Sequence, residues 1–185
     1  MNRLRQLILT FILLWITVKM AFFFTGSALE GQFYMVMLNL FFILMVEFIA
    51  LRLKYKEFTL QQSNFLDDIK TCIRAAASYV IIIVVFIVAY YYLIHPELYD
   101  NKITATVDVV KEQVSTTELF DQLKRDDMSI PPETTPDEYI ANAKENAERL
   151  FGWWFIAGGS LLLLIAVSIF NSVFVTLLYR KVLLK

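Results

Sequence analysis

Long apolar runs separated by polar connections dominate this chain. Four stretches, at about 4–24, 33–53, 73–94 and 150–178, are almost entirely apolar. A helix of about 20 such residues is long enough to cross the hydrocarbon core of a bilayer. The pattern therefore predicts an all-α membrane protein with four transmembrane helices. A hydrophobic share of 58% agrees with that class.

The polar segment 95–149, between the third and fourth apolar stretches, has helix signals of its own. In "TPDE", Thr135 suits an N-cap and Pro136 the first helical position, and two acidic residues follow. "STTE" at 115–118 also has the spacing of a capping box. No glycine or proline lies between Pro136 and Gly152. We therefore expect a helical insertion whose last helix continues through the membrane to about residue 179.

Basic residues mark one side of the membrane. Ten lysines and arginines lie at the amino terminus, in or beside the connection 54–72, and in the carboxyl tail, whereas 95–149 has 13 acidic and 6 basic residues. Short loops rich in lysine and arginine stay in the cytoplasm. We expect 1–94 to hold the first three helices with a cytoplasmic loop at 54–72, and 95–149 to form an acidic extracytoplasmic segment. The last part, 150–185, is then the fourth helix with a basic tail, and both termini are cytoplasmic.

Few residues suit catalysis or metal binding. One cysteine and one histidine do not make a set of ligands for zinc, haem or an iron–sulfur cluster. The chain contains no nucleophile elbow, phosphate-binding loop or dinucleotide fingerprint. It also has no basic face for nucleic acid. We therefore expect a protein that is not an enzyme and that uses no cofactor or metal.

Three polar residues interrupt the first two apolar stretches: Lys19, Asn39 and Glu47. A charge near the middle of a bilayer costs about 2.5 to 3.5 kcal/mol on insertion scales, so each needs a reason. Antiparallel packing places Lys19 level with Asn39, and its ammonium can reach that amide or the interface. For Glu47 we favour an ion pair near the inner boundary, and the candidate partners are Arg5, Arg74 and Arg180. The alternatives are a protonated, lipid-facing side chain and a role in handling protons or ions.

Small residues recur at multiples of four along the last apolar stretch. They are Gly152, Ser160, Ser168, Ser172 and Thr176. Such a stripe lets another backbone approach closely. The third stretch offers small residues at matching depth, among them Ala75 and Ser78. The favoured interpretation is contact between the third and fourth helices, and the alternative is contact with another subunit.

The third stretch ends in a step of a hydrophobic residue, histidine, proline and an acid, formed by Ile94, His95, Pro96 and Glu97. A two-helix amino half precedes it, and a charged helical segment and a final span entered through a capped helix follow. This pattern resembles a family of short bacterial inner-membrane proteins classed as a domain of unknown function. The resemblance implies a bacterial cytoplasmic membrane and no catalytic residue to carry over.

Two hypotheses for function follow. The first is a non-enzymatic accessory or scaffold subunit in the lipid bilayer, which binds another membrane or envelope protein through the helical insertion, the small-residue stripe, or both. The second is a small transporter or ion-conducting protein that uses Glu47, Asn39 and Lys19. Four helices are too few to enclose a roomy polar channel, so the second hypothesis requires a homo-oligomer.

Overall fold

The computed structural model describes residues 2–27, 31–57, 63–127 and 130–183, and almost all of them are helical. Four helices are long and apolar enough to cross a membrane. They are α1 (Asn2–Phe24), α2 (Gln32–Glu57), α3 (Phe65–Ala89) with the π-helical turn Tyr90–Ile94, and α7 (Trp153–Leu178) with the π-helical turn Tyr179–Leu183. Between α3 and α7 lie α4 (Glu97–Gln113), α5 (Thr117–Asp126) and α6 (Pro136–Leu150). The predicted fold class is confirmed.

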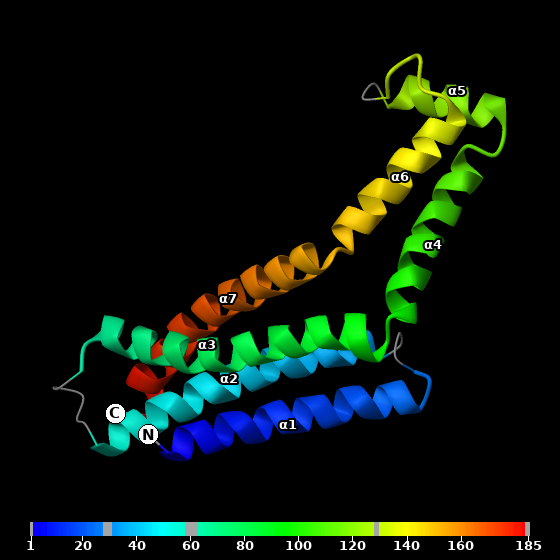
Figure 1. Cartoon of the computed structure of the whole chain (residues 1–185). Coiled ribbons are helices and arrows are strands. Elements are labelled where there is room, and N and C mark those ends of the chain that lie inside the picture. The colour runs from blue at the N-terminus through cyan, green and yellow to red at the C-terminus, as the bar shows by residue number, and fades with distance from the viewer. Residues whose placement is uncertain (1, 28–30, 58–62, 128–129, 184–185) are drawn as a thin grey trace. The chain divides into compact units, whose positions relative to one another are not determined.

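The chain divides into two compact units. The bundle unit comprises Met1–Phe86 and Gly159–Lys185, and it contains α1, α2 and most of α3 and α7. The hairpin unit comprises Ile87–Gly158, and it contains α4, α5 and α6 with the adjoining ends of α3 and α7. Within the bundle unit, the start of α1, the end of α2, the start of α3 and the end of α7 lie at one end (Figure 1). If the four helices cross a membrane in alternating directions, these four helix ends lie on the same side of it.

Two glycines shape the turn between α1 and α2. Gly26 follows α1 with a φ of 73°, in the left-handed region that glycine adopts without strain. At Gly31 a Cβ atom would lie 2.5 Å from the Phe22 ring, so a larger residue would displace that ring. Farther along, the indole Nε1 of Trp15 donates to the Met35 carbonyl oxygen at 3.2 Å. These contacts hold α1 and α2 in one antiparallel register.

The helices extend beyond the predicted spans. α2 continues to Glu57 and α3 begins at Phe65, so the described part of the expected loop 54–72 is mainly helical. The early start of α3 follows from an N-cap, because Asn64 Oδ1 accepts the Asp67 N–H at 2.8 Å. With its π-helical turn, this helix has 30 residues and is about 45 Å long. It therefore exceeds a hydrocarbon core of about 30 Å.

The continuous helix expected over residues 136–179 is wrong, because the structure has two helices there, α6 and α7. At the break, Phe151 has a φ of −88° and a ψ of −1°. The Gly152 N–H donates to the Arg149 carbonyl oxygen, three residues back, at 3.1 Å. A Cβ at Gly152 would lie 3.0 Å from that oxygen. The Tyr92 hydroxyl donates to the Phe151 carbonyl oxygen at 2.6 Å, which satisfies an acceptor at the break.

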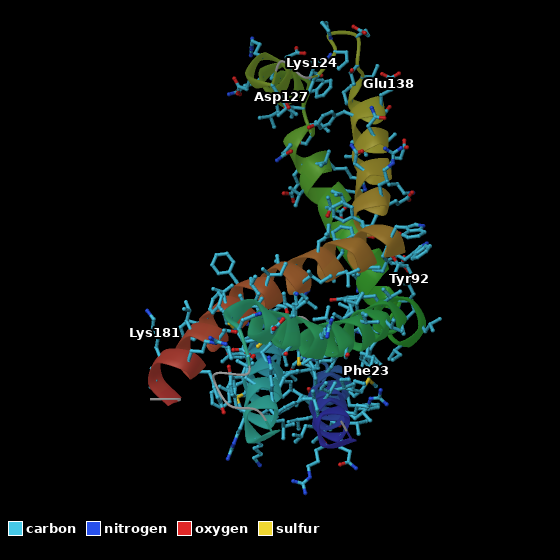
Figure 2. The ribbon with its side chains drawn as sticks, turned by 90° about the vertical axis from the view of Figure 1, so that its left-hand side faces the viewer. Phe23, Tyr92, Lys124, Asp127, Glu138 and Lys181 are labelled. Atoms are coloured by element: carbon cyan, nitrogen blue, oxygen red, sulfur yellow. The ribbon has the colours of Figure 1, made fainter. Side chains whose placement is uncertain are left out.

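In the hairpin unit, α4 and α6 run antiparallel and pack side by side (Figures 1 and 2). Their shared core consists of Ile103 and Val107 from α4 and Ala147 from α6. α5 lies at the far end of this hairpin, where Figure 2 labels Lys124, Asp127 and Glu138. The buried Phe120 ring of α5 lies 5.8 Å from the Tyr139 ring of α6. Apolar contacts therefore join all three helices.

Side-chain caps begin two of these helices. The predicted cap of α6 is confirmed: Thr135 Oγ1 accepts the Glu138 N–H at 3.3 Å, and Glu138 Oε2 accepts the Thr135 N–H at 2.9 Å. For α5 the expected capping box at 115–118 is wrong, because the N-cap lies one residue later and its N3 residue is Leu119. Thr116, not Ser115, is the N-cap, because its Oγ1 accepts the Leu119 N–H at 3.3 Å.

Replacing Thr135 by alanine is expected to destabilise the first turn of α6. The change removes an acceptor for one unpaired helix N–H, which costs about 1 kcal/mol. Hydrogen exchange of the first-turn amides should accelerate about fivefold if opening is local. Thr134→Ala is the control, since Thr134 lies beside the cap and outside it. Equal exchange in the two variants would contradict a capping role for Thr135.

Candidate functional site

Polar side chains are buried in three places inside the bundle unit, and the first joins α2 to α3. The Tyr79 hydroxyl donates to Asn39 Oδ1 at 2.7 Å, and both residues are buried. Lys19 of α1 has only 5% of its surface exposed, so it also lies inside the bundle. Tyr79 was not singled out from the sequence as a buried polar residue, although Tyr79 shares a helical face with Cys72 and Ile83. That face is buried throughout.

The second place is Glu47 of α2, whose side chain is fully buried. The Ser168 hydroxyl of α7 donates to Oε1 at 2.8 Å, while Oε2 has no hydrogen-bond partner in the part of the chain that the structure describes. The expected ion pair of Glu47 with Arg5, Arg74 or Arg180 is therefore wrong. Arg180 follows Ser168 by 12 residues, about 18 Å along a helix. That separation places its guanidinium at a different depth from Glu47.

The third place is Asp68, in the first turn of α3. Its side chain is fully buried, although the sequence had placed it in a solvated loop. Four side chains donate to its two carboxylate oxygens. They are Lys54 Nζ at 2.8 Å, Tyr55 OH at 2.6 Å, Ser63 Oγ at 2.8 Å and Arg180 Nε at 2.6 Å. A carboxylate offers about four lone-pair sites, so this one is saturated.

The Asp68 cluster, formed by Asp68 and these four donors, ties together three parts of the bundle unit. Lys54 and Tyr55 belong to α2, and Arg180 follows α7. Arg180 also donates through Nη2 to the Ser63 carbonyl oxygen at 2.6 Å. Next to the cluster, the Tyr55 and Tyr179 rings stack with centroids 5.4 Å apart. Because every polar group is engaged, we interpret the cluster as a clamp that holds the helix ends together.

The small-residue stripe of α7 is buried in its second half only. Ser168, Ser172 and Thr176 have at most 3% of their surface exposed. Ser160 is partly exposed, and Gly152 lies at the helix break. The interpretation that the stripe faces another subunit is therefore excluded for these three buried residues.

The buried half of α7 packs against α2 and α3 of the same chain. Val175 forms one apolar cluster with Leu51 of α2 and Cys72 of α3. The two small residues of α3 that were expected to contact α7, Ala75 and Ser78, both line a groove beside α1. The small side chains of α7 let it fit against both neighbouring helices.

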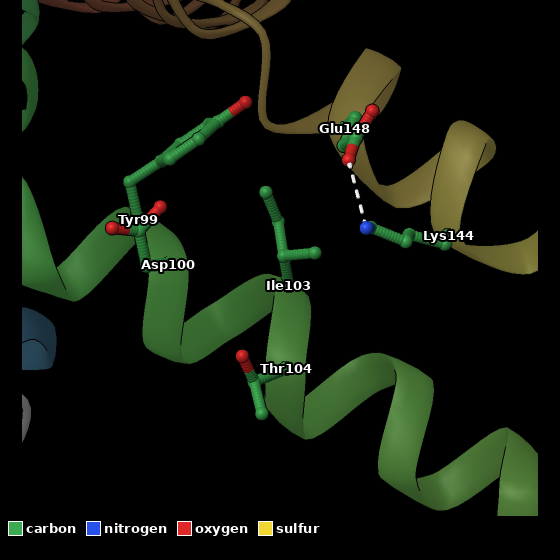
Figure 3. Close-up of a pocket in the computed structure, with 6 residues that line it drawn as sticks. All are labelled: Tyr99, Asp100, Ile103, Thr104, Lys144 and Glu148. Atoms are coloured by element: carbon green, nitrogen blue, oxygen red, sulfur yellow. Dashed lines mark ion pairs between the residues drawn. The ribbon is translucent and has the colours of Figure 1, made fainter.

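A groove lies between α4 and α6 in the hairpin unit (Figure 3). It has a volume of about 410 Å³ and is lined by Tyr99, Asp100, Ile103, Thr104, Lys144 and Glu148. Lys144 and Glu148 pair across one turn of α6 at 3.9 Å. Two carboxylates and one ammonium line the groove, so its charge favours a cationic ligand over an anionic one.

Two of the six basic side chains in 95–149, Lys102 and Lys124, are partly withdrawn from solvent, whereas the other four are exposed. Lys102 Nζ lies 5.6 Å from the ring centre of Tyr91 and 5.8 Å from that of Phe151. Burial lowers the pKa of Lys102, and the aromatic faces stabilise its ammonium. Lys124 Nζ donates to the Pro132 carbonyl oxygen at 2.7 Å. In contrast, all 13 acidic residues of 95–149 are exposed, so the surface is more acidic than the composition alone indicates.

Within the described ranges, no three His, Cys, Asp or Glu side chains lie close enough together to hold a metal ion. A scan against protein-family models, a search of curated proteins and a search of solved structures found no match. The structure by itself defines the class as an all-helical membrane protein with four candidate transmembrane helices and a helical insertion. Membership of the bacterial inner-membrane family stays a prediction.

Proposed function

We propose that this protein is a non-enzymatic accessory or scaffold subunit, which holds a partner protein in a membrane or envelope assembly through its hairpin unit. The observation that carries the proposal is the uneven charge of that unit. All of its acidic residues in 95–149 are exposed, whereas Lys102 and Lys124 are partly buried. The exposed residues of 95–149 are 13 acidic and four basic, and a surface with such an excess of one sign steers and orients a partner of the opposite sign. The partner is therefore a protein with a basic surface.

The internal packing of the hairpin unit supports this role. α4 and α6 share an apolar core, and α5 packs on α6 through Phe120 and Tyr139. A preorganised helical surface loses less conformational entropy on binding than a disordered segment does. The hairpin unit therefore suits binding with little rearrangement.

The proposed location is the bacterial cytoplasmic membrane, with both termini in the cytoplasm and the hairpin unit outside. The distribution of lysine and arginine supports this orientation, because basic residues gather at the end of the bundle unit that holds both chain ends. The hairpin unit then meets its partner in the periplasm or at the periplasmic face of the cytoplasmic membrane.

Carbodiimide cross-linking in native membranes tests the proposal, because this reagent joins carboxylates directly to amines. We expect one stoichiometric partner, with its lysines linked to α4, α5 or α6, and recovery that falls as salt rises. Two neutralised variants locate the contact: Asp100→Asn with Asp108→Asn on α4, and Asp121→Asn with Asp126→Asn on α5. A monodisperse monomer without a partner, or full recovery in both variants, would contradict the proposal.

A second candidate function is a small oligomeric transporter that uses Glu47, Asn39 and Lys19. One observation favours it. Glu47 Oε2 and Thr176 Oγ1 are buried, and neither has a hydrogen-bond partner among the residues described. Such atoms are costly in a bundle core, and intramembrane carboxylates often serve ion or proton pathways. Glu47→Gln should then abolish proton or ion flux in vesicles while the protein stays folded.

A further inference from the structure

A groove between α1 and α3 in the bundle unit combines two arginines with an apolar floor. It has a volume of about 540 Å³, within the range of roughly 300 to 1,000 Å³ that is typical of ligand pockets. Four residues of α1 and five of α3 line it. Arg5 and Arg74 stand at the end of the bundle unit where α1 begins, and Ile82 lies about 12 Å farther along α3. The lining thus changes from charged to apolar with depth.

Both guanidinium groups in this groove lack an acidic partner among the residues that the structure describes. Among the other cations of this end, Lys54 and Arg180 pair with the buried Asp68. Asp67 precedes Arg74 by two helical turns, about 10 Å, and its ion pair is with Lys70 at 3.9 Å. The mouth of the groove therefore carries two positive charges that no described carboxylate neutralises.

The rest of the groove suits an acyl chain. Ile8 is buried at its floor, whereas Leu9 and Ile82 have 52% and 41% of their surfaces exposed. These exposed side chains belong to helices that are apolar enough to cross a membrane. A lipid tail lying between α1 and α3 would cover them.

We propose that this groove binds one anionic phospholipid, with the phosphate between Arg5 and Arg74 and an acyl chain along Ile8 and Ile82. Arginine forms paired hydrogen bonds with phosphate oxygens, and two guanidiniums attract a headgroup of net negative charge more strongly than a zwitterionic one, whose cation offsets the phosphate. This inference does not depend on a protein partner. It concerns the bundle unit alone.

Thr71 indicates which headgroup fits. It lies three residues before Arg74, toward the outside of the groove, and its hydroxyl already donates to the Asp67 carbonyl oxygen at 2.7 Å. The Thr71 oxygen therefore remains an acceptor. A headgroup that carries its own hydroxyl groups, such as the glycerol of phosphatidylglycerol, can donate to it. We expect the glycerol hydroxyls to add a hydrogen bond to Thr71.

Native mass spectrometry of the full chain, released from nanodiscs of mixed lipids, tests the proposal. We expect one phosphatidylglycerol per chain, retained in preference to phosphatidylcholine. The double variant Arg5→Gln with Arg74→Gln should weaken retention about tenfold or more, because charge-assisted bonds to phosphate are lost. The matched control, Arg3→Gln with Arg52→Gln, removes two exposed arginines outside the groove and should retain the lipid. Equal retention in the two double variants would overturn the proposal.

Two further measurements separate a lipid site from a simple phosphate site. Ile82→Trp keeps both guanidiniums but fills the acyl part of the groove, so it should also reduce retention severalfold. It serves in addition as the test if the double arginine variant fails to fold. Soluble glycerol phosphate should produce no thermal shift at concentrations where phosphatidylglycerol does. An equal shift from glycerol phosphate, or unchanged retention in Ile82→Trp, would overturn the lipid proposal.

Discussion

Replacing Asp68 by asparagine is expected to lower the free energy of unfolding of the bundle unit by roughly 3 to 5 kcal/mol. The buried carboxylate accepts from four donors, including Lys54 and Arg180. Asparagine keeps the shape but turns an N–H₂ group toward two of these donors, because each carboxylate oxygen accepts from two of them. It also leaves two partly buried cations, 17% and 21% exposed, without their countercharge. Thermal unfolding in detergent micelles measures the loss.

The control for this change is the neighbouring residue, Asp67. Its side chain is 49% exposed, and its only ion pair among the described residues is with Lys70 at 3.9 Å. Exposed pairs of this kind contribute at most about 1 kcal/mol. Asp67→Asn should therefore unfold close to the wild type. If Asp68→Asn proves as stable as Asp67→Asn, the clamp interpretation of the Asp68 cluster is wrong.

Replacing Glu47 by methionine is expected to raise the stability of the bundle unit by about 1 to 3 kcal/mol, the cost of burying an unsatisfied polar group. Glu47 is fully buried and one of its oxygens has no partner in the described chain, so its desolvation is only partly offset. Methionine has a similar volume and no polar atom to satisfy. The freed Ser168 hydroxyl can then donate to a carbonyl one turn back on α7. The readout is again thermal unfolding in micelles.

Ser168→Ala is the matched variant and should act in the opposite direction. It removes the one described donor to Glu47 Oε1 and leaves the whole carboxyl group unpaired. Leaving a buried polar group without its hydrogen-bond partner costs about 1 to 3 kcal/mol, so a loss of that order is expected. Destabilisation by Glu47→Met together with no effect of Ser168→Ala would contradict this account of the site.

The same residue separates the two candidate functions. If Glu47→Met stabilises the protein, the wild type keeps a carboxylate at a cost to its stability, and such residues concentrate at functional sites. Flux through vesicles then decides between the candidates. Loss of flux in Glu47→Gln supports transport, whereas unchanged behaviour leaves the scaffold role as the stronger proposal.

Local signals in the sequence predicted several parts of the fold correctly. The apolar runs predicted four membrane-spanning helices, and "TPDE" predicted the cap at Thr135. The helix from 136 to 179 was predicted wrongly, because an acceptor at the break is satisfied by the hydroxyl of Tyr92, which is 59 positions away in the sequence from Phe151. The start of α3 was predicted too late, although asparagine is a common N-cap residue and Asn64 could have been recognised as one.

Sequence by itself therefore determined the class of this protein, because helix length, apolarity and capping are properties of neighbouring residues. Only the tertiary structure decided which polar groups meet. Glu47 bonds to a residue 121 positions away and Asp68 to one 112 positions away. Such partners depend on the rotation of each helix and on the depth at which it packs against the others. Periodicity along a nearly uniform apolar helix does not specify either quantity.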